Sequence, residues 1–491
     1  MKKYSPISNL LIDQDKNISN AIRLINKNGE GACFVLSKSK FKAVITDGDI
    51  RSLILKKTPL DTPLFKVFKN KKSFALDYKV KDLTILKKLS KKIKIIPLID
   101  KKTKKVIDYA TLDRVNKIKI YDQQFCGNEL KYITESVKSG WISSAGKYVN
   151  LFEENFGKFI NSKYCLATCN GTAGLQLALK AAGIQPNDEI IVPNISFVAT
   201  INSVINIGAK PVIVDVCEDS YNISIKSILN SITKKTKAII IVHLYGQPCD
   251  LDKIKKICKK NDLLLIQDCA EAIGSKYKNK NISEFGDISV FSFFGNKTIT
   301  TGEGGMLVTN KRSYFQLANS LRDHGMSKSR KYWHDQIGYN FRMTNIQAAI
   351  GLAQLENAKK IIKKKIFIAK LYKKYLKKIQ TNLKTKIIIP LEKKNFTNTF
   401  WLYNIRILGI NEIQRDKLIE NLKTYSIEIR NFFYPFSKMP IYKKFLRKII
   451  NLKISEKIYK NGICLPSSPF LKETQIKYIV DSLKTELKKL D

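Results

Sequence analysis

One lysine of this chain has surroundings unlike those of most of the others. Lys297 lies within FSFFGNKTITTGEGGMLVTN (291–310), among aromatic, small and glycine residues. An amine in such company is expected to be desolvated, and a desolvated amine is a nucleophile and a base rather than a surface charge. The stretch therefore predicts a lysine that forms a Schiff base with a carbonyl group.

A second motif predicts an anion site. In TCNGTAGLQLALKAAG (168–183), Asn170-Gly171-Thr172 stands at the start of an apolar helical segment. The free N–H groups of a helix N-terminus, with a glycine and a hydroxyl beside them, suit a phosphate group. The same residues also suit a simple turn and helix N-cap, so the motif alone leaves both interpretations open.

A carboxylate follows another apolar segment, LLLIQDCAEAIG (263–274), at Asp268. At a buried strand end it needs a cationic partner or several hydrogen-bond donors. Asp268 is then either a helix cap or the partner of a protonated heterocyclic nitrogen. A phosphate site, a buried acid and a desolvated lysine together match pyridoxal 5'-phosphate, which needs them for its phosphate, its pyridinium nitrogen and its aldehyde.

The elements that carry these residues follow one pattern from about residue 121 onward. Short apolar segments alternate with amphipathic ones, which is typical of a mostly parallel α/β sheet with helices on both faces. Ligands of such sheets bind beyond the carboxyl ends of the strands. The predicted strands are EIIVPN (189–194), PVIVDV (211–216), AIIIVHLYG (238–246), LLLIQDCA (263–270), ISVFSFF (288–294) and GGMLVTN (304–310).

The C-terminal part predicts a smaller α/β portion. Residues 357–380 read as one long helix with a lysine-rich face, which we expect to be solvated. A strand at 400–408 and a helix at 414–427 follow.

The first 118 residues predict an internal repeat. Residues 31–54 and 93–115 both read as strand, turn, strand and helix, with Val44-Ile45 aligned on Val106-Ile107. In the first copy Thr46 and Asp49 stand at a strand-to-helix turn, where a hydroxyl and a carboxylate suit ribose hydroxyls. A helix cap is the other interpretation of Asp49. On this alignment the second copy has Asp108 and Thr111 at the same two places.

Composition narrows the class of protein. The 491 residues include 88 Lys and Arg, for a formal net charge of +46, but these residues are scattered along the chain rather than gathered beside aromatic platforms. We therefore expect no nucleic-acid partner, while a basic surface helps to attract a phosphate-rich small substrate. The sequence has no apolar run of membrane-span length and no signal-peptide core, so we expect a cytoplasmic protein. Three histidines and nine cysteines, without a CxxC pair, predict no metal site.

From about residue 121 to 491 the sequence resembles the DegT/DnrJ/EryC1/StrS family of sugar aminotransferases. The resemblance lies in GNELKYITESVKSGWISSAGKYVNLFEENF, CNGTAGLQLAL, VHLYGQPCDLD, DCAEAIGS, SFFGNKTITTGEGG, GYNFRMTNIQAAIGLAQLE and LPSSPFL. It implies the fold type I of aspartate aminotransferase, with a large cofactor-binding α/β domain (119–365) and a small C-terminal α/β domain (366–491). Residues 1–118 resemble an α+β CBS-domain pair, a regulatory module that often binds adenine nucleotides.

The family resemblance implies a role for each matching residue. Lys297 matches the lysine that binds the aldehyde of pyridoxal 5'-phosphate and moves the substrate proton, and Asp268 matches the acid on the pyridinium nitrogen. Phe197 matches the aromatic residue that stacks on the ring, and Glu271 lies where the family has a residue near the phenolic oxygen. The phosphate ligands implied are Gly171, Thr172, the backbone of Ala173, and Ser292.

Four further residues follow from the same resemblance. Asn340 matches an asparagine that reaches the phosphate from the neighbouring subunit, which implies a homodimer with active sites at the interface. Arg342 is expected to contact an anionic group of the substrate. His324 and His334 either contact its sugar or nucleotide or have surface or packing roles.

The implied reaction moves an amino group from L-glutamate to C4 of a nucleotide-linked 4-keto-6-deoxy sugar. RDHGMSKSRKYWH and IEIRNFFYPFSKMPIY are most like the perosamine-forming branch of the family, so GDP-4-keto-6-deoxymannose is the expected acceptor and surface-glycan biosynthesis the expected context. A UDP-4-keto sugar is the alternative acceptor. A non-catalytic regulator with this fold and a basic nucleic-acid binder are two further interpretations of the sequence.

Overall fold

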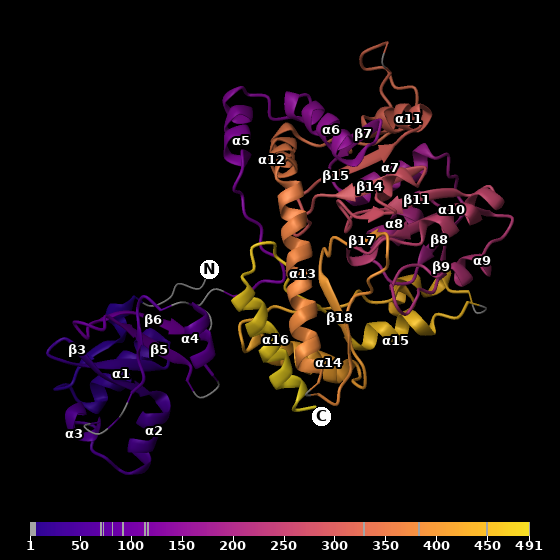
Figure 1. The fold of residues 1–491 in the computed structure, drawn as a ribbon. Coiled ribbons are helices and arrows are strands. Elements are labelled where there is room, and N and C mark those ends of the chain that lie inside the picture. The colour runs from indigo at the N-terminus through magenta and orange to yellow at the C-terminus, as the bar shows by residue number, and fades with distance from the viewer. Residues whose placement is uncertain are drawn as a thin grey trace. The chain divides into compact units, whose positions relative to one another are not determined.

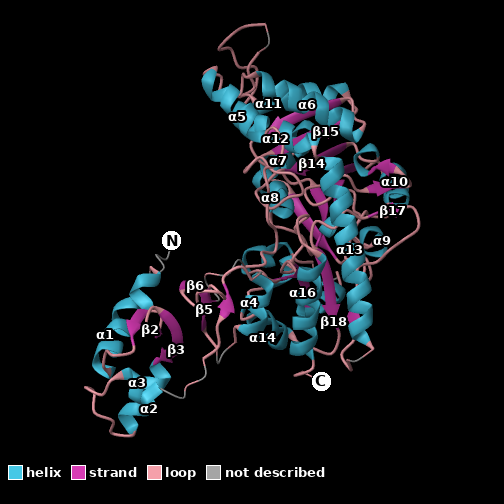
Figure 2. Ribbon diagram, turned by 60° about the vertical axis from the view of Figure 1, so that its left-hand side comes forward, coloured by secondary structure: helices cyan, strands magenta, loops and turns pink. Residues whose placement is uncertain are grey.

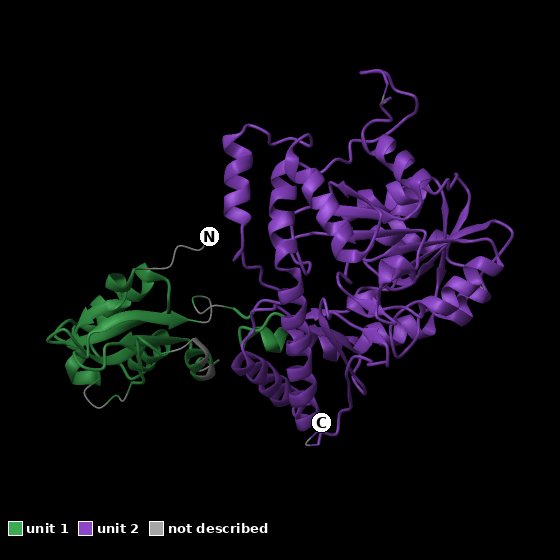
Figure 3. Ribbon diagram, turned by 45° about the horizontal axis from the view of Figure 1, so that its top comes forward, with its two compact units in different colours: residues 1–118, 420–428 green, residues 119–419, 429–491 purple. Residues whose placement is uncertain are grey.

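The computed structural model describes residues 6–490 except 69–70, 72, 81, 91–92, 112–113, 115–116, 328, 382 and 448–449. The chain divides into two compact units (Figure 3). The first comprises residues 1–118 with 420–428, and the second comprises 119–419 with 429–491.

The first unit contains two small three-stranded sheets (Figure 1). In each sheet the first two strands are parallel, the last two form an antiparallel hairpin, and the hairpin carries one register shift. The two sheets therefore share one topology, as expected for a repeat. The elements are β1 (Leu11–Asp13), α1 (Ile18–Asn28), β2 (Ala32–Ser37), β3 (Lys40–Thr46), α2 (Asp47–Leu55), α3 (Leu64–Phe68), β4 (Leu76–Asp77), α4 (Asp82–Lys88), β5 (Ile95–Ile99) and β6 (Val106–Thr111).

The register of the two hairpins corrects the predicted alignment of the repeat. Thr46 closes β3 opposite Ala32, and the residue that closes β6, opposite Ile95, is Thr111. The turn of the second hairpin is two residues longer, because Ile99 pairs with Val106 whereas Leu36 pairs with Phe41. Thr111 and Arg114, rather than Asp108 and Thr111, thus stand where the first copy has Thr46 and Asp49. An alignment of the two copies by their apolar residues alone did not detect the longer turn.

The second unit is built on a seven-stranded sheet, with helices around the strands (Figure 2). Its elements up to the long helix are α5 (Glu129–Lys138), α6 (Lys147–Ile160), β7 (Tyr164–Thr168), α7 (Gly171–Ala181), β8 (Glu189–Pro193), α8 (Ala199–Asn206), β9 (Lys210–Val214), α9 (Ile225–Leu229), β10 (Thr236–Val242), α10 (Leu251–Lys260), β11 (Leu264–Asp268), β12 (Lys276–Tyr277), β13 (Lys280–Asn281), β14 (Ile288–Ser292), β15 (Gly305–Thr309), α11 (Arg312–Arg322) and α12 (Asn345–Glu356).

The order of the large sheet is β7-β15-β14-β11-β10-β8-β9, and β15 runs antiparallel to the other six strands. All five residues of β8 are buried, and successive residues of a strand point to opposite sides of the sheet. Both faces of the sheet are therefore covered. Ile191 joins a core with residues of α6, α10 and α12, whereas Ile190 and Val192 join one with residues of α7, α8 and α11. The predicted α/β sheet and its six strands are confirmed.

The C-terminal elements form a second, antiparallel sheet, with the order β16-β18-β20-β19. The predicted strand and helix here appear as β18 and α14. The elements are α13 (Ala358–Gln380), β16 (Ile387–Ile388), β17 (Phe396–Thr397), β18 (Tyr403–Ile407), α14 (Glu412–Lys423), β19 (Arg430–Asn431), α15 (Lys453–Asn461), β20 (Gly462–Leu465) and α16 (Glu473–Leu487).

Helix α13 is continuous across the expected domain boundary at residue 365. Its lysine-rich face is not solvated throughout, since Lys365 is only 2% exposed. The sequence contains the signal for this exception: Lys365 follows Ile361 by four positions and precedes Ile368 by three, which places all three on one helix face. Among the residues that the structure describes, no helix combines the length and apolar character needed to cross a membrane.

Candidate active site

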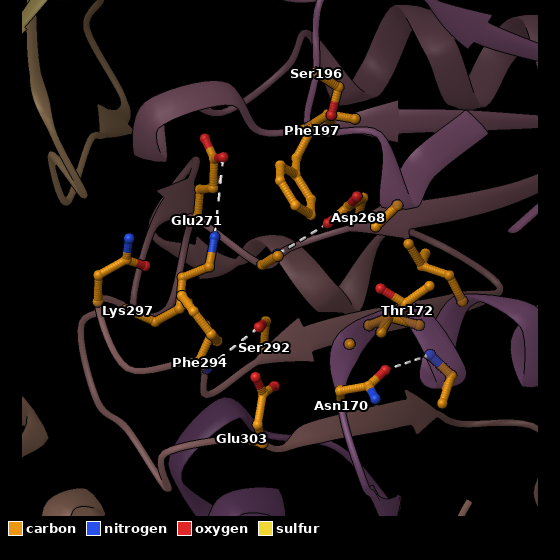
Figure 4. Close-up of a pocket in the computed structure, with 18 of the residues that line it drawn as sticks. Asn170, Thr172, Ser196, Phe197, Asp268, Glu271, Ser292, Phe294, Lys297 and Glu303 are labelled. Carbon is orange, nitrogen blue, oxygen red and sulfur yellow. Dashed lines mark hydrogen bonds and ion pairs between the residues drawn. The ribbon is translucent and has the colours of Figure 1, made fainter. Parts of the chain in front are cut away.

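A cavity of about 710 Å³ opens at the carboxyl ends of β10, β11 and β14 (Figure 4). Val242, Asp268 and Ser292 are the last residues of these strands, and all three line the cavity. The N-terminus of α7 closes one side. Parallel strands bring their carboxyl ends to one edge of a sheet, which is why residues far apart in sequence meet here.

Lys297 lies in the connection between β14 and β15 and points into this cavity. Its side chain is 11% exposed, and its Nζ lies 4.0 Å from Oε1 of Glu271 and 3.9 Å from the ring centroid of Trp401. The side chain of Gln123 donates a 2.6 Å hydrogen bond to the Lys297 carbonyl. Burial lowers the pKa of Lys297, and the neighbouring carboxylates oppose this only in part. The predicted desolvated amine is confirmed.

Asp268 is buried with few donors around it. Its Oδ2 accepts a 2.8 Å hydrogen bond from Thr200 Oγ1, and its Oδ1 accepts a 3.1 Å bond from the Ala270 amide. Burial raises the pKa of Asp268, against the opposing effect of these bonds and of Lys297. A protonated ring nitrogen would supply the positive charge that a carboxylate in this position needs.

Glu271 stands between the lysine and the backbone of Tyr245. Its Oε2 accepts a 2.7 Å hydrogen bond from the Tyr245 amide, and Tyr245 itself has a positive φ of 55°. Burial raises the pKa of Glu271 to about 7, although Lys297 lowers it. Glu271 can therefore hold or release a proton near neutral pH.

The start of α7 forms a cradle of the kind that a phosphate needs. Asn170 caps the helix, and its Oδ1 accepts a 2.8 Å hydrogen bond from the Ala173 amide. A phosphate would share or displace this bond, whereas the amides of Gly171 and Thr172 lie ahead of the intrahelical bonds. A Cβ on Gly171 would lie only 3.0 Å from the Cβ of Ser292, so a side chain there would narrow the cradle.

Phe197 lines the cavity with its side chain largely uncovered. It is 55% exposed, and its ring centroid lies 6.1 Å from that of Phe433. An aromatic ring with an open face beside a buried acid suits stacking on a flat heteroaromatic ligand. The donor set as a whole therefore fits pyridoxal 5'-phosphate.

Four predicted residues are not among those lining the cavity: Asn340, Arg342, His324 and His334. Arg342 forms an ion pair with Asp323, and its Nε donates to Asn340 Oδ1 at 3.2 Å. Phe341, between them, does line the cavity, as expected where neighbouring side chains of an extended segment alternate. Nδ1 of His334 lies 3.0 Å from the carbonyl oxygen of His324.

Thr46 and Asp49 form the capping box of α2 in the first unit. Asp49 Oδ2 accepts from the Thr46 amide at 2.8 Å and from Thr46 Oγ1 at 2.7 Å, and it pairs with Lys71. Burial of Asp49 raises its pKa, but the bonds from Lys71 and Thr46 outweigh it and hold the pKa below its usual value.

Sequence reasoning missed several residues of the cavity. Trp401 and Thr200 contact Lys297 and Asp268, and Arg430 and Phe433 line the wall from the C-terminal portion. A signal existed for Arg430, a cation two residues before the aromatic pair of RNFFYP. No local signal identified Trp401, because its contact with Lys297 joins segments about 100 residues apart.

The seven-stranded sheet, the amine and the acid beyond its strand ends, and the phosphate cradle define the class of pyridoxal-phosphate-dependent enzymes. Comparison with known proteins makes the class narrower. Residues 124–484 match the model of the DegT/DnrJ/EryC1/StrS aminotransferase family, and the chain belongs to this family.

Named relatives and a solved structure agree with this assignment. The chain is 44% identical to GDP-perosamine synthase of Escherichia coli O157:H7, over 74% of this chain and 97% of that protein. It is 41% identical to GDP-perosamine synthase of Vibrio cholerae, over 75% and 98%. The Streptococcus pneumoniae sugar aminotransferase Spr1654 in its PLP-form superposes with a TM-score of 0.70 at 25% identity, over 76% of this chain and 100% of that one.

The cofactor and the type of reaction follow from these matches. Spr1654 has been solved in both a PLP-form and a PMP-form, the two forms between which an aminotransferase alternates. This protein is accordingly an aminotransferase that uses pyridoxal 5'-phosphate. The curated relatives are matched over almost their whole length, so the N-terminal unit is additional to what they share with this chain.

Proposed function

We propose that this chain transfers the amino group of L-glutamate to C4 of GDP-4-keto-6-deoxymannose and so forms GDP-perosamine for a surface glycan. The observation that carries the proposal is its 44% identity to a GDP-perosamine synthase over 97% of that protein. The cavity supports it as well, since it offers an amine, two buried carboxyl groups and an anion cradle.

Each residue of the cavity has a distinct task in this proposal. Bound pyridoxal 5'-phosphate supplies an electron sink next to the carbon that gains or loses the amine. Lys297 takes a proton from that carbon and returns one to it, because burial lowers the pKa of its amine and so favours the uncharged, basic form. Asp268 keeps the ring nitrogen protonated, and Phe197 fixes the plane of the ring. Glu271 holds a proton next to Lys297, because its Oε1 lies 4.0 Å from the Nζ of that lysine.

A panel of acceptors tests this function. The full chain is incubated with pyridoxal 5'-phosphate, L-glutamate and either GDP- or UDP-4-keto-6-deoxy sugars, and the products are read by mass. We expect amination of the GDP-4-keto-6-deoxymannose sample. Amination of UDP sugars alone would assign the alternative substrate, and no amination of any sugar would favour a non-catalytic regulator.

A homodimer is part of the proposal. Apolar side chains stand in water on α5 and on the loop that follows it: Leu130 is 78% exposed, Trp141 60% and Ile142 50%. Exposed apolar side chains of this size are typical of a surface that another chain covers. We expect light scattering to give twice the mass of 56.1 kDa, and Trp141→Glu to shift the population toward the monomer.

We further propose that the N-terminal unit is a CBS pair, which binds a nucleotide near Thr46 and Asp49 and modulates the activity of the enzyme. We also propose that the protein is cytoplasmic. The shared topology of its two sheets supports this. Calorimetry of the full chain with AMP, ATP and GDP tests it, with Asp49→Asn as the comparison. Equal heats of nucleotide binding in the parent protein and in Asp49→Asn would count against a nucleotide site at Thr46 and Asp49.

A further inference from the structure

Lys365 is a buried cation that the proposed reaction does not use. It lies on the inner face of α13, and its Nζ donates hydrogen bonds to the carbonyl of Trp401 at 3.1 Å and to that of Ser467 at 2.8 Å. The Nζ also lies 4.6 Å from the ring centroid of Tyr121. An amine in a core is costly unless its donors are used, and this one joins two loops of the C-terminal portion to the helix.

Trp401 connects this buried amine to the active site. Its ring lies 3.9 Å from the Nζ of Lys297, and its Nε1 donates a 2.8 Å hydrogen bond to the carbonyl of Asn296. Its own carbonyl is the acceptor of Lys365. The indole is thus fixed at one end by its backbone and at the other by the residue that precedes the reacting lysine.

We propose that Trp401 holds and tunes the reacting amine of Lys297 through its ring face, and that Lys365 is the positioning residue that keeps Trp401 there. The inference rests on the proposed role of Lys297 in the aminotransferase reaction. The tasks assigned above to the cavity residues include none for Trp401 or Lys365.

The physical effect is a bias toward the protonated amine. A cation over an indole face is stabilised, most strongly where water is excluded. Among the residues that the structure describes, Glu271 and Asp268 are the carboxylates that raise the pKa of Lys297, so the ring adds to two groups that already favour the ammonium form. Burial works against all three. Loss of the ring should therefore make Lys297 easier to deprotonate.

The direct test measures Lys297 itself in the full chain freed of cofactor. The protein is labelled with limiting acetic anhydride at a series of pH values, and the acetylation of Lys297 is read by mass spectrometry. This readout does not depend on any substrate. We expect Trp401→Leu to move the midpoint of labelling down by about half to one and a half pH units.

Two matched pairs isolate the cause. Trp401→Phe and Trp401→Leu both lose the indole N–H bond to Asn296, and they differ in whether an aromatic face remains, so the shift should be larger for Leu. Lys365→Met should shift the midpoint in the same direction as Trp401→Leu, by less. The control is Lys363→Met, which removes an exposed lysine of the same helix and should leave the midpoint unchanged.

Two outcomes would overturn the inference. Equal midpoints for the Phe and Leu variants would remove the role of the ring. A midpoint for Lys365→Met equal to that of Lys363→Met, with only a lower Tm, would make Lys365 merely structural. If Lys365→Met does not fold, the Phe and Leu pair still decides the first point, and Lys365→Gln decides the second.

Activity is a separate readout. In the holoenzyme, the pH at which kcat reaches half its maximum should move in the same order across the variants as the labelling midpoint. If no variant and no parent shows transamination while the labelling shifts remain, the proposed function fails and the contact between Trp401 and Lys297 stands.

Discussion

Two aspartates stand where a strand ends, Asp268 as the last residue of β11 and Asp49 three residues after β3, and their surroundings are opposite. Asp49 accepts from the amide and the hydroxyl of Thr46 and pairs with Lys71, and its pKa falls. Asp268 accepts from one hydroxyl and one amide inside a cavity, and its pKa rises. Thr46 and Lys71 satisfy the first carboxylate, whereas the second forms no ion pair among the described residues.

The hydrogen-bond partners of a carboxylate distinguish a structural aspartate from a cofactor-binding one better than its position relative to a strand does. Both residues stand at or just after the end of a strand, so their sequence contexts look alike. A carboxylate whose lone pairs are already used stabilises the turn that holds it. A carboxylate that is buried without a full set of donors costs folding free energy, and a ligand can recover that cost on binding.

The largest effect is expected at Lys297, whose amine lies in the same cavity as Asp268. Lys297→Ala should lower turnover by about 10⁴-fold, because the proton carrier at the reacting carbon is lost. Turnover is measured with glutamate and the GDP-4-keto sugar, and circular dichroism confirms the fold. Lys363→Ala serves as the control and should retain full rate. Substantial residual transamination by Lys297→Ala would falsify its assignment.

The comparison itself is tested by making the same change at both aspartates. Asp268→Asn should lower kcat by about 10²- to 10³-fold, since a neutral amide no longer holds the ring nitrogen protonated. Asp49→Asn should leave kcat unchanged when no nucleotide is added. Steady-state kinetics measures both. Similar losses in the two variants would mean that the electrostatic difference has no bearing on catalysis.

A smaller effect is expected at the phosphate cradle. Gly171→Ala places a Cβ about 3.0 Å from the Cβ of Ser292, so one of the two must shift and the cradle narrows. We expect cofactor affinity to fall by about tenfold, which is about 1.4 kcal/mol. Equilibrium dialysis with pyridoxal 5'-phosphate measures it. Gly183→Ala, outside the cavity and with no atom within 4 Å of the added Cβ, is the control and should leave cofactor affinity unchanged.

The smallest effect should have opposite signs at the two aspartates. The pKa of Asp49 is lower in the folded chain, so its ionised form adds stability above the unfolded value of about 3.8, and this is lost as pH falls through the folded pKa. The pKa of Asp268 is higher in the folded chain, so its ionised form costs stability at neutral pH. In the cofactor-free protein at pH 7, Asp49→Asn should lower Tm and Asp268→Asn should raise it, each by about 2–4 °C. Calorimetry at pH 7 checks the signs, and two shifts of equal sign would contradict the argument.

Local patterns were enough to predict the sheet and the centre of the site. The six apolar segments became strands because both faces of the sheet are covered. Asp268 and Ser292 end strands, Lys297 follows one and Gly171 begins a helix, so the four residues meet at one edge of the sheet. The same patterns could not reveal Trp401 or Thr200, whose contacts depend on how distant segments pack. Lys365 was misjudged because a lysine-rich helix hides one core position among many solvated ones.

The repeat shows a different limit. Aligning Val44-Ile45 with Val106-Ile107 assumed that both hairpins have turns of equal length. Strand pairing depends on backbone register, and two extra turn residues slid the second strand without changing its apolar character. Asn340, Arg342, His324 and His334 stay predictions, because their expected roles involve a substrate or a second subunit.

The one antiparallel strand of the large sheet also affects how the site assembles during folding. Because β15 runs back beside β14, Lys297 lies on the loop of a hairpin that spans only residues 288–309, whereas β7, the other neighbour of β15, lies about 140 residues away in sequence. Short loops close far sooner than long ones. We therefore expect the lysine loop to form early, as a local, low-contact-order unit, and the cradle of α7 to reach it late, when the slow long-range pairing of β7 completes the sheet.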